Sequence, residues 1–79
     1  MDKAMDALYR ELLREAHRYR VPMSVLTKLE RRRKKNLSEA VIMLIRNIEI
    51  YSPEGEKESA LLSMKRKRER FSQLQKETI

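Results

Sequence analysis

Apolar side chains recur at intervals of three and four residues along most of the chain, which is the period of an α-helix. The clearest stripe predicts a helix over residues 2–15, with Asp2 in place to cap it. Shorter stripes predict helices over roughly 23–35 and 39–51, and a weaker one predicts a fourth over about 54–76. The stripes of the first and fourth helices are Met5, Leu8, Tyr9, Leu12, Leu13 and Ala16, and then Leu61, Met64, Phe71 and Leu74.

Polar residues and prolines separate these segments. Pro22 disfavours helical geometry at the preceding residue and suits the first turn of the following helix. Asn36 tolerates the left-handed conformation that ends a helix, and Ser38 is a good N-cap for the third one. Ser52 and Pro53 break the third helix from the fourth. With no repeat and no low-complexity linker, the 79 residues are predicted to form a single domain.

Residues 17–21, "HRYRV", have two interpretations. They can be the end of the first helix, which would make the whole protein an all-α bundle. They can also form a short β-strand, along which side chains alternate between two faces. In that case Arg18 and Arg20 share one face, and the other three side chains face the helices. The five residues alone leave both interpretations open.

The third predicted helix is the most hydrophobic segment of the chain. A domain of this size buries only about 60% of its unfolded surface, and without cysteine it has no disulfide to stabilise it. The helix is too apolar to be covered by the other short elements of one subunit, so we expect a homodimer. The residues expected in the dimer core are Tyr19, Val21, Leu29, Val41, Leu44, Ile45 and Ile48.

Charge indicates the class of partner. Nineteen Lys and Arg against twelve Asp and Glu give a net charge of +7, which points to nucleic acid first, an anionic membrane second and an acidic protein third. The run at 31–35 contains no acid and is expected to contact phosphates, whereas the run at 65–70 is more mixed. No apolar run is long enough to cross a bilayer and no signal peptide is visible, so we expect a soluble cytoplasmic protein.

An enzyme is not expected. The chain has one histidine, no cysteine and no glycine-rich phosphate loop, and Asp2 with Asp6 are typical helix-start charges. His17 is expected to be a half-buried ring beside the core. We therefore predict no catalytic residues, no cofactor, no metal site and no small-molecule substrate.

In order and spacing, residues 17–51 resemble the ribbon-helix-helix family of dimeric DNA-binding proteins. "HRYRV" is similar to the family's strand, "VLTKLE" to its first helix, "NLSEAV" to its turn and "IMLIRNI" to its second helix. The resemblance implies a mainly α dimer with one short strand per subunit, residues 2–15 and 53–77 being additional helices.

By this resemblance the protein is a transcriptional regulator that reads double-stranded DNA with a two-stranded ribbon in the major groove. Arg18 and Arg20 would contact bases, since arginine pairs well with guanine. The expected DNA-backbone contacts are Arg31, Arg32, Arg33, Lys34, Lys35 and Ser38.

A second resemblance concerns "ALYRELLREAHRY" at residues 7–19, which is similar to the opening of the LYR-motif proteins. Leu8, Tyr9 and Arg10 would be the motif, and "RRRKKN" lies at a plausible distance downstream. This resemblance implies a small basic all-helical adaptor that binds an acidic partner such as acyl carrier protein. A further alternative is a helical protein that binds nucleic acid without sequence preference.

Overall fold

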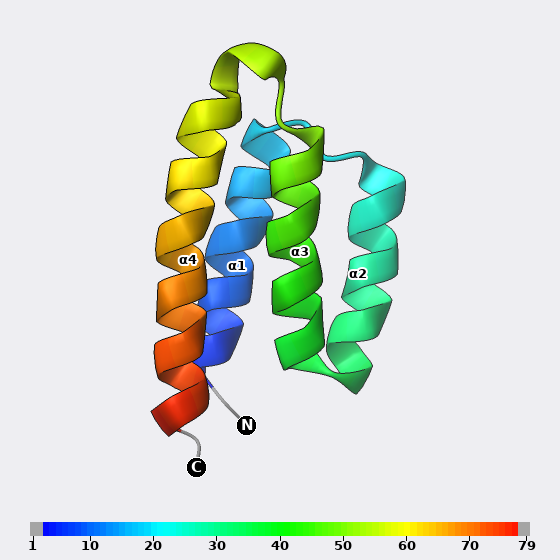
Figure 1. Ribbon diagram of the computed structural model, residues 1–79. Helices are drawn as coiled ribbons and strands as arrows, with labels where there is room; N and C mark the ends of the chain where they lie inside the picture. Colours follow the sequence, from blue (N-terminus) through cyan, green and yellow to red (C-terminus); the bar gives the residue numbers. More distant parts are fainter. Residues whose placement is uncertain (1–2, 78–79) are drawn as a thin grey trace.

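The computed structural model describes residues 3–77, in which four α-helices and one 3-10 turn follow one another without any strand (Figure 1). The predicted cap Asp2 lies outside the described residues. The ribbon-helix-helix fold is therefore wrong, and the alternative, an all-α bundle, is the one observed. The elements are α1 (Lys3–Arg18), α2 (Met23–Lys35), α3 (Leu37–Tyr51), η1 (Glu54–Glu56) and α4 (Lys57–Glu77).

Residues 17–21 end α1 instead of forming a strand. The Val21 amide donates to the carbonyl of Ala16 at 2.9 Å and the Arg20 amide donates to that of His17 at 3.2 Å. Together with a positive φ of 63° at Arg20, these bonds form a Schellman motif, a common helix ending. The reversal buries both Tyr19 and Val21. The alternation in "HRYRV" therefore reflects a helix end that buries Tyr19 and Val21 and leaves His17, Arg18 and Arg20 exposed.

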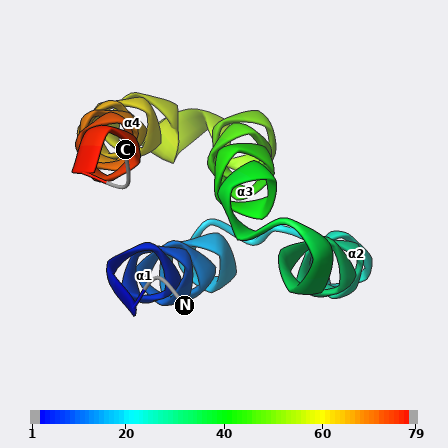
Figure 2. The same ribbon diagram turned by 90° about the horizontal axis from the view of Figure 1, so that it is seen from below.

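α3 is the central helix of the bundle and packs against each of the other three α-helices. Seen along the helices, α1 and α4 lie to one side of α3, and α2 lies to the other (Figure 2). The core consists of apolar side chains from all four helices and from the α1–α2 connection. Its largest fully buried members are Leu8, Tyr9, Leu12, Leu29, Val41, Leu44, Ile45, Ile48 and Met64.

The seven residues predicted for a dimer core are all buried within the single chain, each being at most 5% exposed. The terminal helices explain this burial. Both α1 and α4 pack on α3, so the segments interpreted as additions to a smaller core are parts of the core itself. One chain therefore covers the predicted core face of α3, while Ile42, Ile50 and Tyr51 of the same helix remain exposed.

One residue, Asn36, joins α2 to α3 and caps the second of them. Its backbone is extended rather than left-handed, with φ −153° and ψ 96°. Its side-chain oxygen accepts a hydrogen bond from the amide of Glu39 at 3.1 Å. The predictions of a left-handed Asn36 and of Ser38 as the N-cap are both wrong, because α3 begins at Leu37 and includes Ser38.

The start of α4 is held to the end of α3. The Ser52 hydroxyl donates to the Glu49 carbonyl at 3.1 Å, and the Lys57 ammonium donates to the carbonyls of Glu49 and Ile50 at 2.8 and 3.2 Å. These bonds satisfy acceptors that the last turn of a helix leaves unpaired. In α4, Ala60 and Met64 are buried and Leu61 is 46% exposed. The buried stripe therefore contains Ala60 in place of the predicted Leu61.

Candidate binding surface

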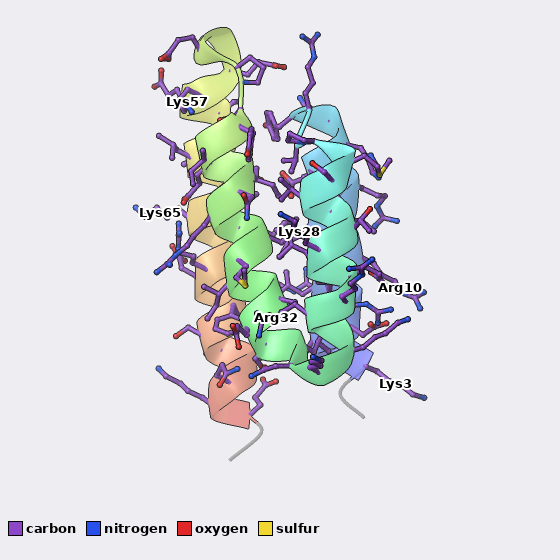
Figure 3. The ribbon with its side chains drawn as sticks, turned by 90° about the vertical axis from the view of Figure 1, so that its right-hand side faces the viewer. Lys3, Arg10, Lys28, Arg32, Lys57 and Lys65 are labelled. Carbon is purple, nitrogen blue, oxygen red and sulfur yellow. The ribbon has the colours of Figure 1, made fainter. Side chains whose placement is uncertain are left out.

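The outward side of α2 carries a row of cations that we call the basic face: Lys28, Arg31, Arg32 and Lys35. These residues line one shallow groove of about 140 Å³, as expected for helical positions three and four apart. α2 buries Leu26 and Leu29. Its main packing partner is α3. The opposite side is therefore free for charged side chains (Figure 3).

Most of the basic face is not neutralised. Among the described residues, Lys28, Arg31 and Lys35 form no ion pair, and Arg32 meets Glu39 at 3.6 Å with both side chains about half exposed (48% and 46%). Lys34, one position away, is also exposed and forms no ion pair within the described chain. Lys28, Arg31 and Lys35 therefore lie without an ion pair along less than three turns of one helix, and a fourth exposed cation, Lys34, lies within electrostatic range of the Glu30 carboxylate, which Arg33 already binds.

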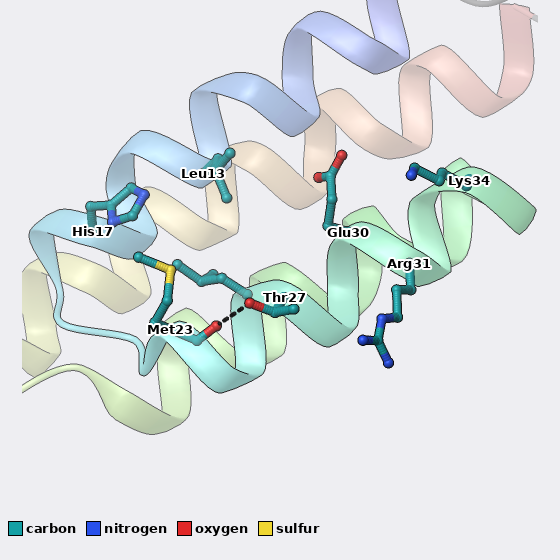
Figure 4. A pocket seen from close by; sticks show the side chains of 8 residues that line it. Leu13, His17, Met23, Thr27, Glu30, Arg31 and Lys34 are labelled. Carbon is teal, nitrogen blue, oxygen red and sulfur yellow. Dashed lines mark hydrogen bonds between the residues drawn. The ribbon is translucent and has the colours of Figure 1, made fainter.

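Beside the basic face, a cleft of about 350 Å³ separates α1 from α2. Leu13 and His17 come from α1, and the other lining side chains come from α2 (Figure 4). The wall is mostly apolar, and the Thr27 hydroxyl is already bonded to the Met23 carbonyl at 2.9 Å. We call this the α1–α2 cleft; its lining residues are Leu13, His17, Met23, Leu26, Thr27, Glu30, Arg31 and Lys34.

A polar network crosses between the two helices at the inner end of the cleft. The guanidinium of Arg33 lies 3.3 Å from an Asp6 carboxylate oxygen, donates to Glu30 from Nε at 3.0 Å, and stacks 5.5 Å from the centre of the Tyr9 ring. The Tyr9 hydroxyl donates to the other Glu30 oxygen at 3.5 Å. This network ties α2 to α1 and occupies the one acid of α2.

The network changes the proton affinity of its members. Burial, followed by the nearby Glu30 charge, raises the pKa of Tyr9 from 10.0 to about 12. The hydrogen bond from Arg33 lowers the pKa of Glu30 below its ordinary value, against the opposing effect of burial. Glu30 is therefore ionised at neutral pH but already paired, and it does not neutralise the basic face.

The residues predicted to contact DNA do not form one surface. Arg18 stacks on the Tyr19 ring at 5.5 Å and Arg20 sits in the turn after α1, so no ribbon aligns them. Arg33 is held by the network just described. Ser38 is half-buried and accepts a hydrogen bond from Gln75 at 2.9 Å. The exposed remainder, Arg31, Arg32, Lys34 and Lys35, does lie together on α2.

The second basic run, at 65–70, is mostly exposed, but half of its residues form ion pairs with acids of other helices. Lys67 lies 3.5 Å from carboxylate oxygens of both Glu11 and Glu15, Arg70 bonds Glu11 at 2.8 Å, and Arg68 pairs with Glu49. The run therefore fastens α4 to α1 and α3. Among the cations of this run, Lys65 and Arg66 are exposed and form no ion pair with the described residues.

Sequence reasoning missed the α1–α2 cleft. The apolar stripe of the first helix predicts that Leu13 belongs to the core, and the sequence predicts no binding role for Met23, Thr27 or Glu30. His17 was expected to be half-buried but is exposed at the edge of the cleft. One sequence signal was available: Met23 is a large apolar residue three positions before Leu26, at the edge of the apolar stripe, and the structure leaves it 65% exposed at the cleft.

Comparisons with known proteins add no assignment. No protein-family model matches the chain, and neither a curated protein nor a solved structure does. Within residues 3–77, no cluster of three or more His, Asp or Glu side chains could hold a metal ion. The helices of this part also lack the combination of length and apolar character that crossing a membrane requires.

Proposed function

We propose that this chain is a small basic adaptor that binds an acidic protein through the basic face of α2 and the adjoining cleft. The observation that carries the proposal is the combination of two features on one helix: cations without partners, and beside them an apolar hollow. An anionic partner relieves the mutual repulsion of Lys28, Arg31 and Lys35, which are neighbours on the helix surface.

The apolar hollow favours a protein over a nucleic acid. A phosphate backbone neutralises cations but has no group suited to a wall of Leu13, Met23 and Leu26. Protein interfaces, by contrast, combine an apolar centre with a charged rim. An acyl carrier protein, which is acidic and helical, is a suitable representative partner and agrees with the LYR resemblance.

Double-stranded DNA is the second candidate. It is favoured by the basic face of α2, which includes three of the residues expected to contact the DNA backbone, Arg31, Arg32 and Lys35, with a fourth, Lys34, beside it. Binding of this kind would be sequence-independent and would weaken steeply as salt concentration rises, because it depends on release of counterions.

The proposal can be tested by titrating the protein with acyl carrier protein and, separately, with a DNA duplex in a calorimeter at moderate salt. The test variant is Arg31→Glu/Lys35→Glu on α2. The matched control is Lys65→Glu/Arg66→Glu on α4, which makes the same change in net charge at exposed positions. We expect the α2 variant to lose at least about tenfold in affinity for the acidic protein, and the control less than about threefold.

Two outcomes would contradict the adaptor. Equal losses in the α2 variant and in the α4 control would indicate attraction by net charge alone. Binding to the duplex that depends on α2, without binding to the acidic protein, would favour the second candidate.

A further inference from the structure

The α1–α2 cleft lies on the side of these two helices opposite to α3. Viewed along the helices, α3 packs above the gap between α1 and α2, and none of the helices in residues 3–77 lies below it (Figure 2). The cleft found there has a volume of about 350 Å³, near the lower end of the range of ligand sites in proteins. It is an open groove whose two walls are α1 and α2.

The cleft is apolar at its base and carries ionisable side chains at its outer edge. Leu26 is buried at the base and Leu13 is partly buried against the core, while Met23 is largely exposed at one end. The outer edge carries His17 on one wall and the two cations Arg31 and Lys34 on the other. The single acid of the lining, Glu30, is held by Arg33 and Tyr9.

We infer that the α1–α2 cleft receives an amphipathic helix of the acidic partner, with apolar side chains against Leu13, Met23 and Leu26 and carboxylates beside Arg31 and Lys34. This inference rests on the proposed function and specifies which element of the partner is bound. A helix laid in a groove between two helices inserts apolar anchors at positions i, i+3, i+4 and i+7. Carboxylates flanking that stripe reach the cations on the α2 wall.

Charge argues against a second copy of this chain as the source of the helix. Leu61 and Leu62 of α4 are exposed apolar residues, but the next turn carries the exposed cations Lys65 and Arg66. Docking α4 would place these cations beside Arg31 and Lys34. We therefore take the partner to be a separate acidic chain, and self-association through the other exposed apolar residues, Ile42, Ile50 and Tyr51 of α3, is one outcome that the test below distinguishes.

The inference can be tested with a synthetic helical peptide that has leucines at i, i+3, i+4 and i+7 and glutamates at the flanking positions. A peptide of the same composition, reordered so that the leucines share no face, is the control ligand. Binding is followed by fluorescence anisotropy of the labelled peptide, and the folded state of every variant is checked by circular dichroism.

The test variant is Thr27→Trp, which places a large ring in the cleft from an exposed position of α2. The matched control is Ser24→Trp, the same change one turn earlier at an exposed position that does not line the cleft. We expect Thr27→Trp to weaken peptide binding at least about tenfold, Ser24→Trp less than about threefold, and the reordered peptide to bind at least about tenfold more weakly. Should Thr27→Trp fail to fold, methyl chemical shifts of Leu13, Met23 and Leu26 on titrating the unmodified protein give the same information.

The outcomes separate the inference from the proposed function. If the acidic protein binds and depends on Arg31 and Lys35, but the peptide ignores Thr27→Trp or binds equally well when reordered, the inference is wrong and the adaptor stands. If neither the protein nor the peptide binds, both are wrong. Self-association that Thr27→Trp abolishes would overturn the choice of a separate partner.

Discussion

Arg20 shows how a single backbone conformation decides between two folds for the same five residues. Its φ of 63° lies in the left-handed region, where an L side chain is disfavoured. Glycine is the usual residue at this position of a Schellman motif, and its absence removed the clearest sign of a helix end. Without a glycine, the polar residues beside Arg20 and the alternating pattern are as consistent with a β-strand as with a helix end.

This conformation leads to the first prediction. Replacing Arg20 with Gly should stabilise the protein by about 0.5–1 kcal/mol, because relief of left-handed strain exceeds the cost of the extra conformational entropy that glycine gives the unfolded chain. Arg20→Ala is the control, since alanine has the same backbone restriction as arginine without its charge, and it should be nearly neutral. Urea unfolding at neutral pH measures both. Equal stabilities for the Gly and Ala variants would mean that the backbone strain is not felt.

At the scale of the element, short polar linkers define the helices more sharply than the apolar stripes do. α2 and α3 are separated by Asn36 alone, whose amide bonds the Arg32 carbonyl at 2.8 Å and whose side chain caps the next helix. The predicted bounds of α2 agree with the structure. α3 begins two residues earlier than predicted, because serine and asparagine are both good caps and the sequence contains one of each within three residues.

Substitutions at these two residues test which of them is the cap. Asn36→Ala should cost about 1 kcal/mol of stability and Asn36→Gly only a few tenths, as measured for other N-caps. Ser38→Ala should cost less than Asn36→Ala, because the Ser38 oxygen bonds Gln75 and does not serve the first turn of α3. Thermal unfolding followed by circular dichroism compares the three. A larger cost at Ser38 would contradict the assignment of the cap.

At the scale of the whole molecule, polar contacts between helices add to the apolar core in holding the helices together. The bundle measures 39 × 25 × 14 Å, so it is thin and much of each helix faces outward. α4 is tied to α1 and α3 by the ion pairs of its basic run, and α2 is tied to α1 by the Tyr9–Glu30–Arg33–Asp6 network. Burial raises the pKa of Glu11, but the stronger combined effect of Arg70 and Lys67 holds it below its ordinary value.

The network between α1 and α2 predicts how stability depends on alkaline pH. Because the pKa of Tyr9 rises from 10.0 to about 12 on folding, the folded protein holds the phenol proton more tightly than the unfolded chain. The resulting stability is fully present below the ordinary pKa and is lost as pH rises towards the folded value. Between these limits the wild type should lose on the order of 2 kcal/mol more than Tyr9→Phe, since a pKa unit corresponds to about 1.4 kcal/mol.

Denaturant titrations of the two proteins across this pH range measure the difference. At neutral pH the Phe variant should be less stable by about 1 kcal/mol, having lost the hydrogen bond to Glu30. The two proteins differ only at residue 9, so the comparison isolates the contribution of the Tyr9 phenol. Parallel curves would mean that Tyr9 ionises in the folded state as it does in water.

The sequence by itself determined the helices with strong apolar stripes and nearly all of the core, because helical periodicity and side-chain burial are local consequences of residue type. The apolar stripes predict burial, for example, of Leu8, Leu12, Leu44 and Ile48, and all four are buried. The tertiary structure decided that α1 and α4 cover α3 within one chain, because that depends on how distant segments pack together. It also decided which cations are free: Lys67, Arg68 and Arg70 meet carboxylates from other helices, whereas Lys28, Arg31 and Lys35 meet none. Charge neutralisation depends on neighbours in space, and those neighbours are distant in the sequence.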